Sequence, residues 1–362
     1  MSPKLEYLIH ILEWVRIEEF VTASWHGVGR PPHERAWLAN AFVAKMVLGL
    51  TTTTHLLERL MIDRALRRIC GFSLHKKLPS ESTFSRAFSE FAKDRLAERT
   101  HAELVKTHLG DRLIGHLSRD GTAIEARERP QRHKTESEPT SRTGPQPPLL
   151  AEEPPGGKEQ GADPAPDQSK RGRPRKGESR PPKLTVARQR TQTLAAMLEE
   201  IPTECSRGAK SNAQGYKNSW NGYKLHLDTA DCGVPVSALL SSASMHDSRA
   251  AIPLSLISAG RVTNLYDLMD AAYCSQDLQE HCRELGHVPL IDHNPRGGEK
   301  EAFEPADAVR YRERSTAERI NGRLKDDFGG RHIRVRGAAK VMNHLMFGVL
   351  ALSADQLMRL RR

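Results

Sequence analysis

The stretch YRERSTAERINGRLK, residues 311–325, carries four arginines and one lysine against two glutamates. On an ideal helix each residue turns by 100°, so four of these side chains share an arc of about 60°. They are Tyr311, Arg314, Glu318 and Lys325. The apolar residues fall on a neighbouring face that can pack on a sheet. The spacing therefore predicts one helix with a charged stripe, in which Glu318 is better placed to serve a site than the other glutamate.

Composition limits what the whole 362-residue chain can be. Its formal net charge is +10 and its pI is about 9.5, an excess that indicates a polyanionic partner such as nucleic acid or an anionic surface. The five cysteines contain no CxxC pair, which argues against a zinc knuckle and a disulfide framework. No apolar run approaches the length of a membrane span, and the N-terminus has acids inside its apolar stretch. We expect a soluble protein of a reducing cytoplasm.

Residues 131–204 differ from the rest of the chain because they are polar and rich in proline. Such a composition does not bury enough apolar surface to offset the entropy of ordering, so we expect a disordered insert. Within it the segment GRPRKG resembles an AT-hook, whose extended core places two arginines, here Arg173 and Arg175, in a narrow minor groove. A solvated basic linker explains the same residues.

Before the insert the pattern is helical. Residues 34–50, 54–72 and 78–96 have apolar residues three and four positions apart. The last two segments, joined by the turn at residues 71–79, could form a helix-turn-helix that reads DNA. Its reading helix would begin with Ser82, Thr83, Ser85 and Arg86. An ordinary helical bundle explains the same pattern.

After the insert the apolar period changes from helix to strand. Residues 222–230 and 234–244 alternate or run apolar like consecutive strands, and residues 261–270 and 287–291 are strand-like again. Helical segments lie between the later strands and after them. Strands in hairpin order, followed by strands alternating with helices, predict a mixed sheet with helices packed on it.

The spacing Y-x2-R-x3-E-x6-K of the opening stretch resembles the signature of bacterial insertion-sequence transposases of the DDE class, in the branch related to families four and five. The resemblance implies two aspartates on upstream strands. Asp120, followed by Gly121 and Thr122, resembles the family's Asp-Gly-Thr strand. Asp270 ends an apolar run, although Ala272 stands where the family often has glycine before the tyrosine.

Other acids compete with Asp270 for this role. Asp267 lies in the same strand with the opposite side-chain parity, so both cannot face one site. Asp292 also ends a strand, but its block resembles the family's strand and loop before the glutamate helix. His246 and Asp247 match a family block too, yet Asp247 is explained most simply as a helix N-cap.

The resemblance implies an α/β fold: an RNase H-like mixed sheet with flanking helices, preceded by an all-helical domain and interrupted by the disordered insert. The expected domains are a helical DNA-binding domain at residues 1–108 and a catalytic domain at residues 109–130 and 205–362. Asp120 would lie on the first strand, Asp270 on the fourth, and Glu318 on the last core helix.

The resemblance also implies the chemistry. Three carboxylates at one sheet edge are hard oxygen ligands that can hold two Mg²⁺ or Mn²⁺ ions for in-line phosphoryl transfer on double-stranded DNA. Arg314 and Lys325 would bind phosphate, and Tyr311 would stack or hydrogen-bond near the cut nucleotide. Pairing two element ends implies a homodimer on DNA, working at the nucleoid of a bacterial cytoplasm. Two alternatives are a DNA-binding repressor without catalysis and an RNase H-like nuclease that does not join strands.

Overall fold

The computed structural model of the chain describes residues 1–22, 33–130, 185–211, 215–295 and 299–361. The N-terminal helices and the sheet belong to one compact unit. Most of the predicted insert, including Arg173 and Arg175, lies outside the described residues.

The N-terminal part is helical, as expected. Its elements are α1 (Pro3–Val15), η1 (Ile17–Phe20), α2 (Arg35–Val47), α3 (Thr53–Ile62), α4 (Arg64–Ile69), α5 (Glu81–Lys93) and α6 (Leu96–Leu109). The predicted helical segment 54–72 is divided at Asp63, whose carboxylate accepts a hydrogen bond from the Leu66 amide at 3.0 Å and caps α4. Residues 70–80 then join α4 to α5, a connection longer than the three or four residues of a helix-turn-helix turn. That part of the prediction is therefore wrong in its geometry.

Six strands within the described residues form one mixed sheet. They are β1 (Leu113–Glu125), β2 (Ser206–Ser211), β3 (Lys217–Ala230), β4 (Pro235–Ser242), β5 (Thr263–Met269) and β6 (Val288–Ile291). The path runs β2-β3-β1-β5-β6, and β4 also pairs with β3. β1, β2 and β4 pair with β3 in antiparallel fashion, whereas β5 is parallel to β1 and β6 to β5. This mixed α/β arrangement agrees with the predicted RNase H-like class.

β2 is a strand that the sequence did not predict. Its residues SRGAKS show no apolar alternation, and it is held by pairing with the first half of β3, from Ser206 opposite Gly222 to Ser211 opposite Lys217. Because β2 comes before β3 in the chain, the strand that leads to Asp270 is the fifth and not the fourth.

The helices after the insert cover the sheet. They are α7 (Val186–Gln189), α8 (Leu194–Glu200), α9 (Ser248–Ala259), η2 (Ala271–Tyr273), α10 (Gln276–Glu284), α11 (Pro305–Tyr311), η3 (Arg312–Arg314), α12 (Ser315–Asp327) and α13 (Ala338–Leu360). The predicted end of the disordered insert at residue 204 is too late, because α7 and α8 precede it. Met197 of α8 is buried in a core cluster with Ile252 and Tyr273, and this burial orders the segment.

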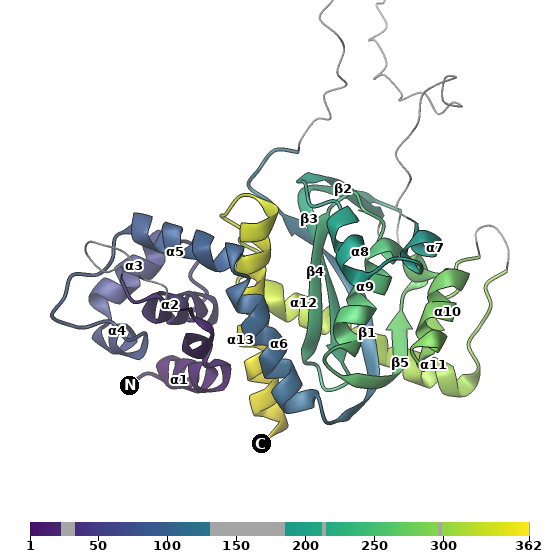
Figure 1. Ribbon diagram of the computed structural model, residues 1–362, viewed down its shortest axis with the longest axis horizontal. Helices are drawn as coiled ribbons and strands as arrows, with labels where there is room; N and C mark the ends of the chain where they lie inside the picture. Colours follow the sequence, from purple (N-terminus) through teal and green to yellow (C-terminus); the bar gives the residue numbers. More distant parts are fainter. Residues whose placement is uncertain (23–32, 131–184, 212–214, 296–298, 362) are drawn as a thin grey trace, which may run out of the picture. The chain divides into compact units, whose positions relative to one another are not determined.

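Helix α13 joins the helical part to the sheet (Figure 1). Almost every residue from Val341 to Ala354 is buried, and the same apolar cluster contains residues of α1, α2, α5, α6 and β3. The imidazole of His101 on α6 lies within hydrogen-bond distance of both the Ser353 hydroxyl on α13 and the Pro235 carbonyl on β4. Among the described helices, including α13, none is long and apolar enough to cross a membrane.

A buried ion pair fixes β1 against β3 and α9. Arg119 donates from Nε to Oδ1 of Asp228 at 2.7 Å and from Nη2 to Oδ2 at 2.8 Å, and both side chains are at most 1% exposed. The Ser258 hydroxyl of α9 donates to the same carboxylate at 2.6 Å. Neighbouring side chains of a strand point to opposite faces, so Asp120 lies on the face that carries α12.

We predict that Asp228→Ala destabilises the protein by about 3–5 kcal/mol, because it leaves the Arg119 guanidinium buried without its partner. Urea denaturation at neutral pH measures the change. The control is Asp326→Ala, which removes an exposed partner of Arg331 and is expected to cost at most about 1 kcal/mol. Equal losses in the two variants would contradict the prediction.

Candidate active site

Asp120 and Asp270 are brought together by the parallel pairing of β1 with β5. The last paired residues are Arg119 and Met269, and each is followed directly in the chain by one of the two aspartates. Adjacent strands lie about 4.8 Å apart, so the carboxylates share one corner of the sheet. Asp270 follows the end of β5, where its Oδ1 accepts a hydrogen bond from the Ala272 amide at 2.9 Å.

Both aspartates are harder to ionise than free aspartate. Burial raises the pKa of Asp120 to about 6, and the nearby charge of Asp270 also raises it. Burial likewise raises the pKa of Asp270, against the Ala272 hydrogen bond, which lowers it. Lys210 of β2 and Arg314 lower the pKa of both carboxyls. Two acids that resist ionisation at one corner have the electrostatics expected of a cation site.

Glu318 lies apart from the aspartate pair. It sits in the first turn of α12 with its side chain 56% exposed, and its Oε1 accepts a hydrogen bond from Arg314 Nη2 at 2.6 Å. Within the described part of the chain, no three His, Cys, Asp or Glu side chains lie close enough together to hold a metal ion. The structure thus brings two of the three predicted acids together.

The predicted single helix over residues 311–325 is divided. Tyr311 ends α11, the 3-10 turn η3 follows, and Glu318 and Lys325 lie on α12, so the ideal 100° phase does not extend through the segment. The basic and aromatic members are nevertheless close enough to the aspartates to interact with them electrostatically. Burial lowers the pKa of Lys325, against the charge of Asp120, which raises it. Burial raises the pKa of Tyr311 to about 12, and Asp270 contributes to this rise.

Two residues of the site were missed by the sequence analysis. Asn321 of α12 donates from Nδ2 to Oδ2 of Asp120 at 2.9 Å. It lies three residues after Glu318, a spacing that puts both on one side of a helix and could have revealed it. Lys210 could not be predicted in this way, because the residues of β2 show no apolar periodicity. β2 is held by its pairing with β3, and only the folded chain brings Lys210 close enough to lower the pKa values of the aspartates.

The rival acids have other partners. Asp267 is buried on the opposite face, where its Oδ2 lies 2.9 Å from His287 Nδ1, so the parity argument is confirmed. Asp292 pairs with Lys300 at 2.9 Å. Asp247 occupies the N-cap position of α9 but makes no side-chain cap hydrogen bond. Its Oδ1 accepts from Lys224 Nζ at 2.8 Å instead, which corrects the simple N-cap interpretation.

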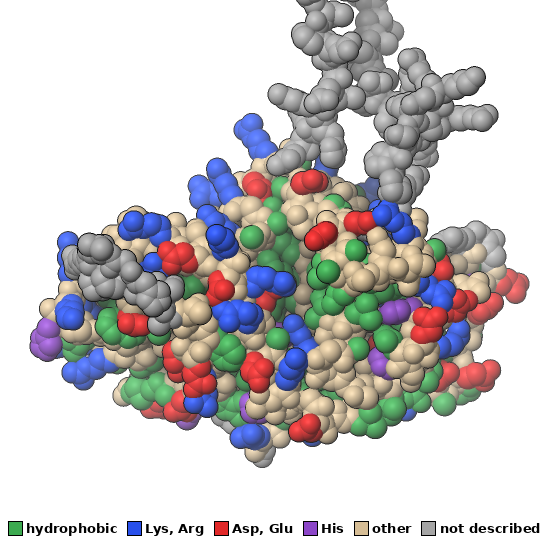
Figure 2. Space-filling view, viewed as in Figure 1, with side chains coloured by type: hydrophobic (Ala, Val, Ile, Leu, Met, Phe, Trp, Pro, Cys, Tyr) green, Lys and Arg blue, Asp and Glu red, His purple; other side chains and the backbone are tan. Residues whose placement is uncertain are grey.

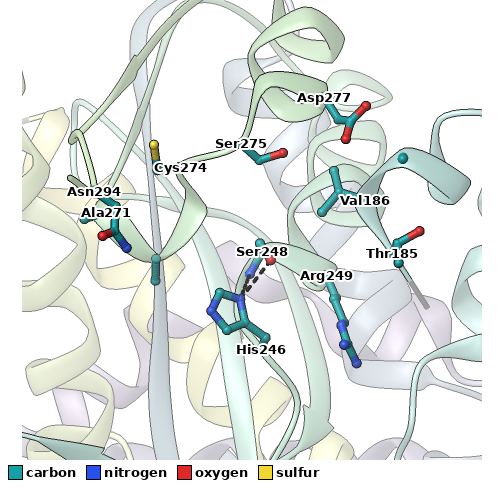
Figure 3. Close-up of a pocket in the computed structure, with 12 residues that line it drawn as sticks. Thr185, Val186, His246, Ser248, Arg249, Ala271, Cys274, Ser275, Asp277 and Asn294 are labelled. Carbon is teal, nitrogen blue, oxygen red and sulfur yellow. Dashed lines mark hydrogen bonds between the residues drawn. The ribbon is translucent and has the colours of Figure 1, made fainter. Parts of the chain in front are cut away.

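A pocket of about 410 Å³ adjoins the loop after Asp270 (Figure 3). Its lining includes Ala271, Ala272 and Cys274 from this loop, and His246, Ser248 and Arg249 from the start of α9. His246 Nδ1 and Ser248 Oγ lie 2.8 Å apart, so the ring is held at the pocket wall. Neither Asp120 nor Asp270 lines this pocket, so it is not the proposed cation site.

Comparison with known families identifies the class. A family model described as "Transposase DDE domain" matches residues 190–354, and one described as "Transposase domain (DUF772)" matches residues 2–90. Searches among curated proteins and among solved structures found no match. The chain belongs to the DDE transposases of insertion sequences. The first match contains Asp270, Glu318 and Arg314, whereas Asp120 precedes it and is joined to Asp270 by the fold.

DDE transposases are DNA-cleaving enzymes that generally use divalent metal ions. The donor chemistry of this corner fits such an ion, because Asp120 and Asp270 offer adjacent hard oxygen ligands whose raised pKa values a cation would lower. Glu318 fits only after its carboxylate leaves Arg314.

We predict that Asp120→Asn stabilises the metal-free protein at pH 7 by about 1–3 kcal/mol and has little effect at pH 4. The unfolded carboxyl loses its proton near the ordinary value of 3.8, but the folded one does so only near 6. The free energy of unfolding of the wild type therefore falls as the pH rises from about 4 to about 6. The side-chain amide of the Asp120→Asn variant does not ionise, so its free energy of unfolding lacks this decrease. Urea denaturation in EDTA between pH 4 and pH 7 measures the free energy of unfolding of both proteins. If this free energy has the same pH dependence in both, the pKa of Asp120 is not raised.

Proposed function

We propose that this transposase binds the ends of its insertion sequence and catalyses metal-dependent DNA strand cleavage and strand transfer at Asp120, Asp270 and Glu318. The observation that carries the proposal is the placement of Asp120 beside Asp270 at the end of their parallel pairing, with both pKa values raised. Strand cleavage and joining are phosphoryl transfers, in which paired carboxylates serve as ligands for divalent ions.

Asp120 and Asp270 would hold Mg²⁺ or Mn²⁺, two ions when Glu318 joins them. Ions bound there would supply the activation of a water or 3′-hydroxyl and the stabilisation of the leaving oxygen. The protein's own residues then orient the DNA. Arg314 could exchange Glu318 for a phosphate, because a guanidinium binds carboxylate and phosphate oxygens with the same N–H donors.

Other basic groups around the aspartates support DNA binding. Lys325 and Lys210 act electrostatically on the aspartate corner from two sides, one from α12 and one from β2. Lysine binds phosphate as a point charge, and Tyr311 of α11 offers a ring for stacking beside Arg314. Together these lysines, Arg314 and Tyr311 would hold the DNA strand on both sides of the phosphate that is cut.

The helical part of the chain is the proposed end-binding domain, residues 1–108. Figure 2 shows Lys and Arg side chains on the displayed face over α5 and α6, with acidic side chains among them. Ser82, Ser85 and Arg86 are exposed near the start of α5, where they are accessible to DNA. Arg173 and Arg175 would add minor-groove contacts, and a homodimer at the bacterial nucleoid would pair the two ends.

A labelled element-end fragment incubated with Mg²⁺ tests the proposal. Wild-type protein is expected to give both nicked and joined products. Asp120→Ala, Asp270→Ala and Glu318→Gln are each expected to reduce them at least about 1,000-fold while the Kd for the fragment changes less than about threefold. Removing the metal with EDTA should have the same effect, because the carboxylates alone cannot activate the nucleophile.

Matched acids provide the controls. Asp111→Asn and Glu313→Gln change acids outside the proposed site and should keep wild-type activity. Nicking without joining would favour the nuclease, and binding without either would favour the repressor. Full activity in Asp120→Ala, Asp270→Ala or Glu318→Gln would remove that residue from the site.

A further inference from the structure

Asn321 is the residue by which α12 contacts Asp120. Its side-chain amide donates to Asp120 Oδ2 at 2.9 Å, and the residue is only 4% exposed. Its own Oδ1 is buried and has no hydrogen-bond partner among the described residues. An unpaired buried oxygen is unfavourable, so a need for stability alone does not explain an asparagine at this position.

Glu318 does not make this contact, although it lies on the same side of α12. It is one turn earlier and is bonded to Arg314. The residue of α12 that contacts Asp120 is therefore the neutral donor Asn321. The negative charge of Glu318 is balanced by Arg314. This arrangement keeps the negative charge of Glu318 away from the two aspartates, where Asp247 already opposes the ionisation of Asp270.

We infer that Asn321 is a positioning residue, which fixes the orientation of the Asp120 carboxylate so that its other oxygen faces Asp270 and a shared divalent ion. The inference rests on the proposed function. Hydrogen bonds to a ligating carboxylate orient it, and loss of such partners commonly costs about 10- to 100-fold in metal affinity or activity. The asparagine would thus prepare the aspartate pair for a cation before Glu318 joins.

Mn²⁺ binding to the full-length protein without DNA tests this role, with the free ion measured by electron paramagnetic resonance. Asn321→Ala is expected to weaken Mn²⁺ binding by about 10- to 100-fold. The control is Arg319→Gln on the exposed side of the same helix, where the guanidinium contacts Thr316 within α12. This control should bind Mn²⁺ like wild type, and Asp120→Asn should lose binding.

A second variant guards against a loss caused by misfolding. Asn321→Asp keeps the shape of the side chain but brings a carboxylate against Asp120. The two acids repel each other without metal and can share a cation when it is present. Mn²⁺ should therefore raise the Tm of Asn321→Asp more than that of wild type, and the Tm of Asn321→Ala less. A residue that only tethers the helix would give equal Mn²⁺ shifts in all three proteins.

The outcomes separate the two proposals. If wild type binds Mn²⁺ and Asp120→Asn does not, but Asn321→Ala binds like wild type, the positioning role is wrong and the proposed function stands. If wild type binds no Mn²⁺, the proposed metal site is wrong and the role of Asn321 is wrong with it.

Discussion

The buried pair between Arg119 and Asp228 fixes the strand on which the site depends. Arg119 and Asp120 are neighbours on β1 and point to opposite faces of the sheet. A slip of β1 by one residue would exchange these faces, placing the arginine away from Asp228 and the aspartate against α9. Because an unpaired buried charge costs several kcal/mol, the pair opposes that slip. The position of Asp120 beside Asp270 is thereby a consequence of packing on the other face.

The charges of α12 and η3 are satisfied within the protein before DNA is present. Arg314 donates a hydrogen bond to Glu318, and its charge lowers the pKa values of Asp120 and Asp270. One guanidinium therefore stabilises the negative charge of three acids. A phosphate or a divalent ion that enters must compete with these contacts. The structure contains the arrangement in which Glu318 bonds to Arg314. The proposed function requires another, in which Glu318 leaves Arg314 and joins the two aspartates.

Local pattern was a good guide to the elements that bury an apolar face. The segments that form α2 to α5 and the strands β3, β4 and β5 were predicted, because their apolar residues repeat with the period of the element. β2 and α7 were not, because they are polar and are held by neighbours distant in the chain. Asp120 and Asp270 were chosen through a family resemblance and strand parity. Asn321 was not predicted because it is uncharged and because, at about 280° on an ideal helix that starts at Tyr311, it lies between the charged stripe and the apolar face.

Local sequence is enough to indicate which residues can form the site: one acid within a strand, one after a strand, and a basic segment near the C-terminus. Its apolar periods likewise indicate the strands and helices. Tertiary structure decided which of them meet. The parallel register joins Asp120 to Asp270 across 150 residues of chain, and the packing of α12 brings Asn321 to Asp120 while Glu318 bonds to Arg314. The physical reason is that periodicity encodes which side of an element is buried, whereas pairing between distant elements depends on the packing of the whole unit.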